Sequence, residues 1–345
     1  IVHVSIGGNA PRVRFSNLFG TAPLAITGAH LAPALGGSQI DTRADVALTF
    51  AGQSSVSIPA GQELWSDPAQ LTVPASSDLA VTLYLAGEAP VSTVHGVAQS
   101  TAFATSGSAL ADAEYAMPAT STMYYWITGL DVDAPAAKGV VVAFGDSITD
   151  GVGSTLDANH RYPNYLAQRL AAQASTAGYG VVNEGISGNR VLHDVAGPSA
   201  LSRFQRDALG NSGATDVIIL IGINDIGFSG IVPAEAVSAQ DITSGLATLV
   251  QQAHGAGLRA FLATLTPFEG TMAPYYSDAG ETEREAVNSW IRSNRDIDGV
   301  VDFDATLQDP SDPKSMRSDL NSGDHLHPND LGYQTMANAI DIGSL

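Results

Sequence analysis

The segment VVVAFGDSITDG, residues 140–151, decides the fold. Its first five residues are apolar and rich in Val, as expected of a strand buried on both faces of a parallel sheet. The Gly-Asp-Ser triplet that follows ends this run and begins a polar turn. A buried strand that ends in a polar turn is typical of doubly wound α/β sheets, in which reactive groups collect at the carboxyl ends of the strands.

The alternation of strand and helix continues to the end of the chain. Four further strand-like runs follow, at 181–183, 217–221, 260–265 and 300–303. Between them, apolar residues recur at i, i+3, i+4 and i+7, which indicates amphipathic helices. Strands and helices in alternation predict a parallel sheet with helices on both faces, so the fold class of residues 140–345 is α/β.

Residues 1–130 have a different pattern. Short segments rich in Val, Ile, Thr and aromatic residues alternate there with Gly, Pro, Asn and Asp. This pattern predicts an all-β sandwich domain, jelly-roll-like in type. Residues 131–139 form the expected linker between the two domains, and 345 residues are enough for two cores.

The composition excludes several classes of partner and site. The formal net charge is −20 with a pI near 4.4, so no basic patch is expected to bind nucleic acid. The chain has no Cys, which removes disulfides, thiol nucleophiles and zinc-thiolate sites. No apolar run approaches the length of a membrane-spanning helix, so no transmembrane segment is expected.

The composition also suggests a location. Abundant small residues, few charges and no Cys fit an exported bacterial protein, extracellular or periplasmic. The sequence begins at Ile1 without Met, within a strand-like run, so we expect that a leader preceded it. The oligomeric state is left open by the sequence.

Four polar clusters occupy positions at which a doubly wound sheet places its reactive groups. They are residues 145–151, 183–190, 222–225 and 324–329. Ser147 follows the first strand at a sharp turn, where its hydroxyl can stand exposed as a nucleophile. A serine hydroxyl needs a base within hydrogen-bonding distance, and His327 is the candidate.

The remaining parts of an acyl-transfer site have candidates in the same clusters. Asp324 lies three residues before His327 and is placed to orient its ring and to stabilise the imidazolium. The backbone N–H groups of Ser147 and Gly188, with the side-chain amide of Asn224, are candidate donors to an oxyanion.

These clusters together resemble the SGNH subgroup of the GDSL hydrolases. Gly-Asp-Ser at 145–147, Gly188, Gly-x-Asn-Asp at 222–225 and Asp-x-x-His at 324–327 match its four blocks in family order, over about residues 139–345. The resemblance implies a flavodoxin-like three-layer α/β/α domain and a serine esterase or lipase that needs no cofactor. It also implies that Ser147, Asp324 and His327 are the catalytic residues, with Ser147, Gly188 and Asn224 as the oxyanion hole.

Other polar residues near the clusters have expected roles as well. His193 and Arg190 are candidates for substrate binding. Asp146 and Asp225 are interpreted as structural residues that brace the turn and the neighbouring block. His325 alternates with His327, so in an extended segment its ring would point away from the site.

The expected function is hydrolysis of carboxylic esters with short to medium acyl chains, including acetyl or acyl groups on glycans or lipids. The substrate would be a small molecule or a polysaccharide ester. We expect the segment 266–281, rich in Gly, Pro and Tyr, to form a wall of the substrate pocket. One alternative is a metal-dependent hydrolase that holds a divalent ion with Asp146, Asp324, His325 and His327. Another is a carbohydrate-binding protein that acts through the β-domain. The N-terminal part is similar to the β-domain of two-domain bacterial GDSL esterases.

Overall fold

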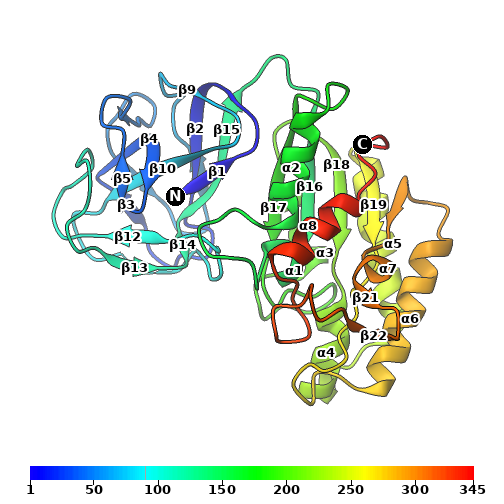
Figure 1. Cartoon of the computed structure of the whole chain (residues 1–345). Helices are drawn as coiled ribbons and strands as arrows, with labels where there is room; N and C mark the ends of the chain where they lie inside the picture. Colours follow the sequence, from blue (N-terminus) through cyan, green and yellow to red (C-terminus); the bar gives the residue numbers. More distant parts are fainter. Residues whose placement is uncertain (90) are drawn as a thin grey trace. The chain divides into compact units, whose positions relative to one another are not determined.

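The computed structural model describes residues 1–89 and 91–345. Two compact units emerge, Ile1–Ala136 and Ala137–Leu345. The predicted linker, residues 131–139, overlaps the strands at both ends. Strand β15 (Ile127–Asp133) includes the first three residues of this linker, and strand β16 (Gly139–Gly145) begins at the last residue of the linker (Figure 1).

The first unit is built of antiparallel strands in two main sheets. One sheet has the order β1-β10-β4-β5 with β6 beside β4, and the other has the order β15-β2-β8 with β9 beside β2. Both sheets supply side chains to a single core, which includes Phe15 of β2, Leu31 of β4 and Leu79 of β10. The predicted all-β class is therefore confirmed, with two sheets packed on a common core. The other strands pair as β3 with β7, β11 with β14 and β12 with β13. The bounds are β1 Val2–Val4, β2 Gly8–Ser16, β3 Leu24–Ile26, β4 Gly28–Gly36, β5 Gln39–Ile40, β6 Val46–Ala47, β7 Val56–Ile58, β8 Glu63–Trp65, β9 Thr72–Val73, β10 Ser77–Tyr84, β11 Val94–His95, β12 Ala102–Ala104, β13 Ala119–Ser121 and β14 Tyr124–Tyr125.

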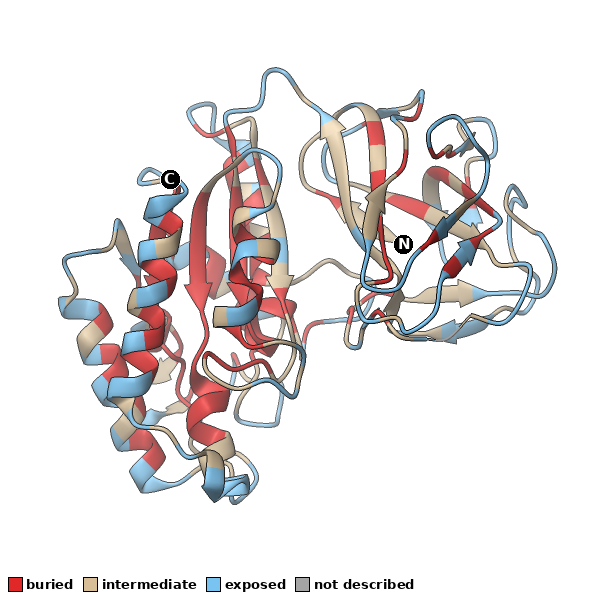
Figure 2. Cartoon of the chain, turned by 180° about the vertical axis from the view of Figure 1, so that it is seen from behind, coloured by how far each residue is buried: buried red, intermediate tan, exposed pale blue. Residues whose placement is uncertain are grey.

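The second unit contains a five-stranded parallel sheet in the order β17-β16-β18-β19-β20. The first strand of this unit in the chain lies second in the sheet, which is the flavodoxin-like order. All five strands predicted from the sequence are present. The central strands β16, β18 and β19 are largely buried, whereas the edge strands β17 and β20 are only partly buried (Figure 2). The remaining bounds are β17 Tyr179–Gly185, β18 Ala214–Leu220, β19 Arg259–Ala263 and β20 Gly299–Val301, with a small hairpin of β21 Gln308–Asp309 and β22 Asp312–Met316.

Helices cover the sheet in two groups. Helix α8 contacts α2 and α7, whereas α5 contacts α3, α6 and strand β19. Figure 1 shows α2 and α8 in front of the sheet, and the predicted α/β/α layering is confirmed. The bounds are α1 Ser147–Asp150, α2 Tyr162–Ala172, α3 Ala200–Phe204, η1 Gln205–Leu209, α4 Ile223–Ile231, η2 Pro233–Glu235, α5 Ala239–Gly255, α6 Asp278–Ser293, α7 Phe303–Leu307 and α8 Asp330–Ala339.

Local sequence explains how α5 forms. Ser238 accepts a hydrogen bond from the Asp241 N–H while the Asp241 carboxylate accepts one from the Ser238 N–H, so the helix begins with a capping box. The apolar stripe that the spacing predicts, including Leu246 and Leu249, is buried. This apolar face packs against the sheet, where α5 contacts strand β19.

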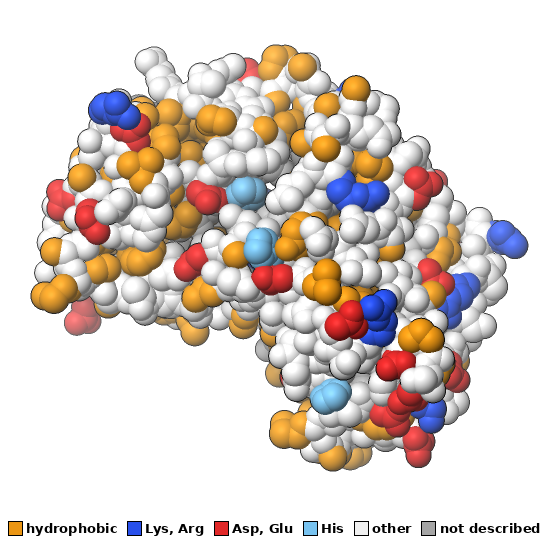
Figure 3. Space-filling model, viewed as in Figure 1, with side chains coloured by type: hydrophobic (Ala, Val, Ile, Leu, Met, Phe, Trp, Pro, Cys, Tyr) orange, Lys and Arg blue, Asp and Glu red, His pale blue; other side chains and the backbone are white. Residues whose placement is uncertain are grey.

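None of the helices within 1–89 and 91–345 is both long enough and apolar enough to cross a bilayer. On the face drawn in Figure 3, Lys and Arg side chains are scattered singly among acidic and neutral ones.

Candidate active site

Ser147 stands at the turn between β16 and α1. Gly145, the last residue of β16, has no room for a side chain because a Cβ would collide with Thr149 and with the Leu220 carbonyl oxygen. The Asp146 carboxylate accepts the Ile148 N–H at 3.0 Å and caps α1. The predicted bracing role of Asp146 is thus confirmed, and the turn holds Ser147 at the carboxyl edge of the sheet.

His327 is hydrogen-bonded to both Ser147 and Asp324. Its Nε2 lies 2.8 Å from the Ser147 Oγ, and its Nδ1 lies 2.5 Å from the Asp324 Oδ2. The other Asp324 oxygen accepts the N–H groups of Leu326 at 2.9 Å and His327 at 2.8 Å. The structure therefore brings together the three residues predicted as nucleophile, base and orienting acid.

The charge state of Asp324 follows from these contacts. Burial alone would raise its pKa, but hydrogen bonds from the His327 ring and from the His327 and Leu326 N–H groups outweigh that effect. The net result is a pKa below the usual range for Asp. An ionised Asp324 favours the His327 tautomer with its proton on Nδ1, which leaves Nε2 free to accept the Ser147 proton.

The three predicted oxyanion donors lie on three different segments: α1, the loop after β17, and α4. Ser147 is the first residue of α1, where a backbone N–H lacks an intrahelical acceptor. Gly188 has φ +79°, and a Cβ there would lie 3.0 Å from the Ala196 Cβ, so glycine suits both the backbone and the space. Asn224 is the second residue of α4, and its Nδ2 donates to the Asn189 carbonyl oxygen at 3.0 Å.

Two carboxylates tie the polar clusters to one another. Asp225 accepts the N–H groups of Val191 at 2.7 Å and Leu192 at 3.1 Å, which confirms its predicted structural role. Asp150 accepts the Ser187 N–H at 3.2 Å. The loop that carries Gly188 is thus fixed to α1 on one side and to α4 on the other.

Arg203 is a supporting residue that the sequence did not reveal. Its buried guanidinium donates to the carbonyl oxygens of Gly145 at 2.8 Å and Glu184 at 2.9 Å, and to the Asn189 side chain at 3.0 Å. It therefore joins the ends of β16 and β17 below the site. The segment that carries Arg203, residues 199–207, has no motif or residue spacing that would predict this role.

Burial changes the pKa values of two acids beside the site. Desolvation raises the pKa of Asp146 to about 7, even though the Ile148 N–H and the charge of His327 act in the opposite direction. Desolvation likewise raises the pKa of Asp225 to about 6 against the hydrogen bonds from Val191 and Leu192. The Asp146 Oδ2 is buried and has no hydrogen-bond partner.

The two predicted substrate-binding residues differ in their surroundings. Arg190 is 3% exposed and donates to Glu235 at 2.7 Å and to the Asp194 carbonyl oxygen at 2.8 Å. Its guanidinium is thus occupied by partners within the protein, so a substrate contact by Arg190 is not supported. His193 is half-buried in the same loop, and its role in substrate binding stays a prediction.

The expectation of an extended backbone at His325 is wrong. His325 has φ +63°, and residues 324–327 form a turn closed by the Asp324 carboxylate. The His325 ring lies over Gly270, where an added Cβ would come within 2.9 Å of its Cγ. This contact joins the turn of His327 to the segment 266–281.

The metal-site alternative finds no support among the described residues. Within 1–89 and 91–345, no group of three or more His, Asp or Glu side chains is arranged to hold an ion. Both ring nitrogens of His327 already have protein partners.

In the first unit, the Trp65 ring is covered by the guanidinium groups of Arg12, at 4.6 Å, and Arg14, at 5.4 Å. Carbohydrate binding by this unit stays a prediction.

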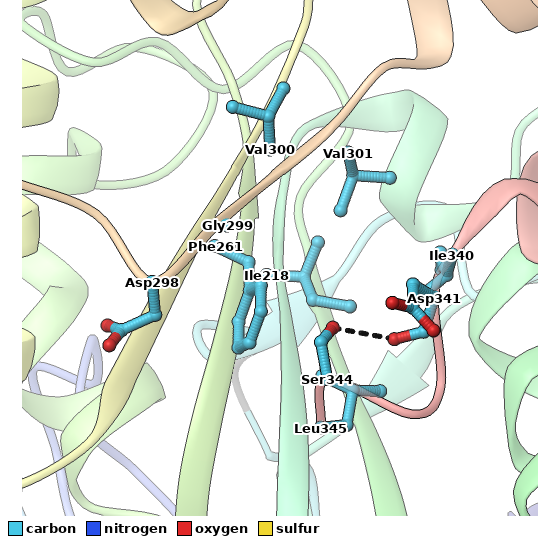
Figure 4. A pocket seen from close by; sticks show the side chains of 10 residues that line it. All are labelled: Ile218, Phe261, Asp298, Gly299, Val300, Val301, Ile340, Asp341, Ser344 and Leu345. Carbon is cyan, nitrogen blue, oxygen red and sulfur yellow. Dashed lines mark hydrogen bonds between the residues drawn. The ribbon is translucent and has the colours of Figure 1, made fainter. Parts of the chain in front are cut away.

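A separate hollow lies on the parallel sheet away from Ser147. It is bounded by Ile218, Phe261 and residues 298–301 on one side and by the segment 340–345 on the other (Figure 4). Its carboxylate Asp298 accepts the Ala260 N–H at 2.8 Å and contacts His254 at 2.8 Å. None of the predicted site residues lines this hollow.

Comparison with known proteins places this geometry in a family. The model of the GDSL-like Lipase/Acylhydrolase family matches residues 143–335. A GDSL-like lipase from Bacteroides thetaiotaomicron is similar in structure, with 19% identity and a TM-score of 0.44, covering 60% of this chain and 87% of that one. A hydrolase from the metagenome of Lake Arreo in Spain has 26% identity and a TM-score of 0.46, covering 59% and 94%. An acetylxylan esterase from Geobacillus stearothermophilus has 24% identity and a TM-score of 0.45, covering 59% and 93%.

Comparison with curated proteins gives no match. The family model nevertheless spans more than half of the chain and includes Ser147, Gly188, Asn224, Asp324 and His327. The chain belongs to the GDSL-like lipase/acylhydrolase family and is a carboxylic ester hydrolase.

Proposed function

We propose that the protein hydrolyses esters through an acyl-enzyme formed on Ser147. The observation that carries this proposal is the continuous hydrogen-bonded series from the Ser147 Oγ through the His327 ring to the Asp324 carboxylate. A serine hydroxyl becomes nucleophilic when a base accepts its proton as the new bond forms. His327 is within hydrogen-bonding distance, and Asp324 holds its ring.

In the acylation step, His327 Nε2 takes the Ser147 proton while Oγ attacks the ester carbonyl carbon. The carbonyl oxygen gains the negative charge and is stabilised by the N–H groups of Ser147 and Gly188 and by the Asn224 amide. The tetrahedral intermediate collapses when the C–O bond to the alcohol breaks, and His327 gives its proton to that oxygen. A water molecule then repeats the sequence on the acyl-enzyme and releases the acid.

We propose short to medium acyl chains as substrates, including acetyl or acyl groups on glycans or lipids. The support is the accessibility of the site, because about half of the Asp324 side chain, 48%, is exposed beside the His327 ring. The opening lies beside the orienting acid, since the His327 side chain is 12% exposed and Ser147 is 3% exposed. An ester whose alcohol part extends toward Asp324 would have room there.

The test compares hydrolysis of p-nitrophenyl acetate, butyrate and octanoate by wild type and Ser147→Ala, each with and without EDTA. We expect Ser147→Ala to lose roughly 1,000-fold or more in kcat, because the covalent step disappears. EDTA should leave the wild-type rate unchanged. The chain-length profile of kcat/KM defines the acyl preference.

Ser154→Ala is the matched control. Ser154 is also buried in this unit, but its hydroxyl donates to the Gly151 carbonyl oxygen at 2.7 Å and not to His327. We expect this variant to keep the wild-type kcat. A Ser147→Ala enzyme that retains its rate and loses it with EDTA would replace the acyl-enzyme proposal with the metal-dependent one.

A further inference from the structure

Tyr275 contacts the site from a segment outside the four polar clusters. Its hydroxyl donates to the Asn224 Oδ1 at 2.9 Å, and the Ile223 carbonyl oxygen lies farther away at 3.4 Å. Asn224 is thus held at both ends of its amide, by Tyr275 at the oxygen and by the Asn189 carbonyl at the nitrogen.

The two contacts together determine which end of the amide is which. The Asn189 carbonyl oxygen can only accept a hydrogen bond, so the NH₂ group of Asn224 must face it. The Asn224 Oδ1 then faces the Tyr275 hydroxyl, which must donate. One N–H of the amide is used on Asn189, and the second remains available for a substrate oxygen.

The Tyr275 ring has almost no freedom to move. It packs edge-on against Phe228 and Phe268, with ring centroids 6.2 Å apart in each case. On the face of α4, a Cβ at Gly227 would overlap the Tyr275 ring, and a Cβ at Gly230 would overlap the Pro274 carbonyl oxygen. Two glycines three residues apart therefore let residues 274–275 approach the backbone of the helix that carries Asn224.

We propose that Tyr275 is a positioning residue for the oxyanion hole. Its hydroxyl fixes the orientation of the Asn224 amide and, by donating to Oδ1, polarises the N–H that faces the oxyanion. This inference rests on the proposed function of Asn224 as an oxyanion donor. Since the oxyanion forms only as the ester is attacked, loss of the hydroxyl should lower kcat and leave KM nearly unchanged.

The experiment is a double-mutant cycle with Tyr275→Phe, Asn224→Ala and the double variant, assayed on p-nitrophenyl acetate with melting curves for each. We expect Tyr275→Phe to lower kcat about 5- to 50-fold and Asn224→Ala about 100- to 1,000-fold. In the double variant, kcat should lie within about two-fold of Asn224→Ala alone, because Tyr275 acts through that amide.

Tyr162→Phe is the matched control for removing a buried hydroxyl. Tyr162 is fully buried and its hydroxyl contacts Thr149 at 3.3 Å, with no contact to Asn224. We expect it to keep kcat within about two-fold of wild type. If Asn224→Ala melts below the assay temperature, Asn224→Ser takes its place in the cycle.

Three results would overturn the inference, and they can be told apart. A wild-type kcat in Tyr275→Phe, with Asn224→Ala impaired, removes Tyr275 and leaves the proposed function intact. An equal fold-loss from Tyr275→Phe with and without Asn224 shows that the hydroxyl acts elsewhere. Full activity in both Asn224→Ala and Ser147→Ala removes the proposed function, and the inference with it.

Discussion

A fully buried carboxyl group adjoins the nucleophile. Asp146 is 1% exposed, and only one of its two oxygens has a hydrogen-bond partner. Burying an ionised carboxylate costs free energy unless its oxygens are satisfied, so the protein favours the protonated form. This is why desolvation raises the pKa of Asp146 to about 7 from an ordinary value of 3.8.

The raised pKa predicts how stability depends on pH. Between about pH 4 and pH 7, the folded state keeps a proton on Asp146 that the unfolded chain has lost, so the titration of this group lowers the stability of wild type as pH rises through this window. Asp146→Asn keeps an oxygen for the Ile148 N–H and cannot ionise. We expect the difference in free energy of unfolding, variant minus wild type, to increase by roughly 1–4 kcal/mol from pH 5 to pH 8.

Urea unfolding of both proteins across this range measures the difference. Subtracting wild type from the variant cancels the titration of groups that the two share, including Asp225. A difference that is the same at pH 5 and pH 8 would show that Asp146 is ionised throughout the range.

Among the elements, α4 makes an unusually close contact with a loop. Its sequence places Gly227 and Gly230 on the side that meets residues 274–275, and the Tyr275 ring occupies the space that a side chain at Gly227 would need. The glycines weaken the helix itself, since Gly costs about 1 kcal/mol in a helix interior. The contact with the loop offsets that cost.

Replacing these glycines should separate helix propensity from packing. Gly227→Ala adds a methyl group that collides with the Tyr275 ring, and we expect it to destabilise the protein by about 1–3 kcal/mol. Gly255→Ala is the matched control, because Gly255 is the last residue of α5 and a Cβ there meets nothing within 4 Å. It should be neutral or stabilise by up to about 1 kcal/mol. Thermal and urea unfolding measure both, and a harmless Gly227→Ala would contradict the packing argument.

The elements differ in how well the sequence predicts them. Strands of the parallel sheet are buried on both faces, so their continuous apolar runs are visible in the sequence. The sequence of strand β4, GAHLAPALG, does not indicate a strand, because small residues and Pro33 are disfavoured in strand interiors. It becomes a strand by pairing with β10 over residues 28–33, a contact that only the folded chain creates.

The site shows the same division. Ser147, Asp324 and His327 were predicted because they lie in short motifs, and the turn at 324–327 is local enough to bring the acid and base together. Tyr275 was predicted only as part of the pocket wall 266–281, and its contact with Asn224 was missed because it joins residues 51 apart in the sequence. Two glycines three residues apart in a helix, Gly227 and Gly230, are a hint of a close approach by another segment.

At the scale of the whole molecule, the hydrophobic clusters of the described residues do not mix the two units: one lies in the second unit and two lie in the first. The larger core draws all of its buried members from residues 141–342, and the other cores draw theirs from residues 4–80. Every hydrogen bond described above for Ser147, His327, Asp324 and Asn224 lies within the second unit.

We therefore expect residues 137–345, produced alone, to fold and to hydrolyse p-nitrophenyl acetate with a kcat within a few-fold of the full chain. A small soluble ester needs only the groups of the second unit. Activity on an insoluble glycan ester, measured in parallel, reports any contribution of residues 1–136 to substrate binding. An inactive but folded fragment would show that the first unit completes the site.

The base and its orienting acid are three residues apart on one turn, whereas the nucleophile lies 180 residues before the base. The imidazole and the carboxylate are consequently held by one local turn, and within the Ser147–His327–Asp324 series only the distance from Oγ to Nε2 joins residues far apart in the sequence. The value of kcat then reports how well the turn 324–327 is held against Ser147. A denaturant concentration that unfolds only the segment from this turn to the C-terminus would therefore abolish activity while the parallel sheet remains folded.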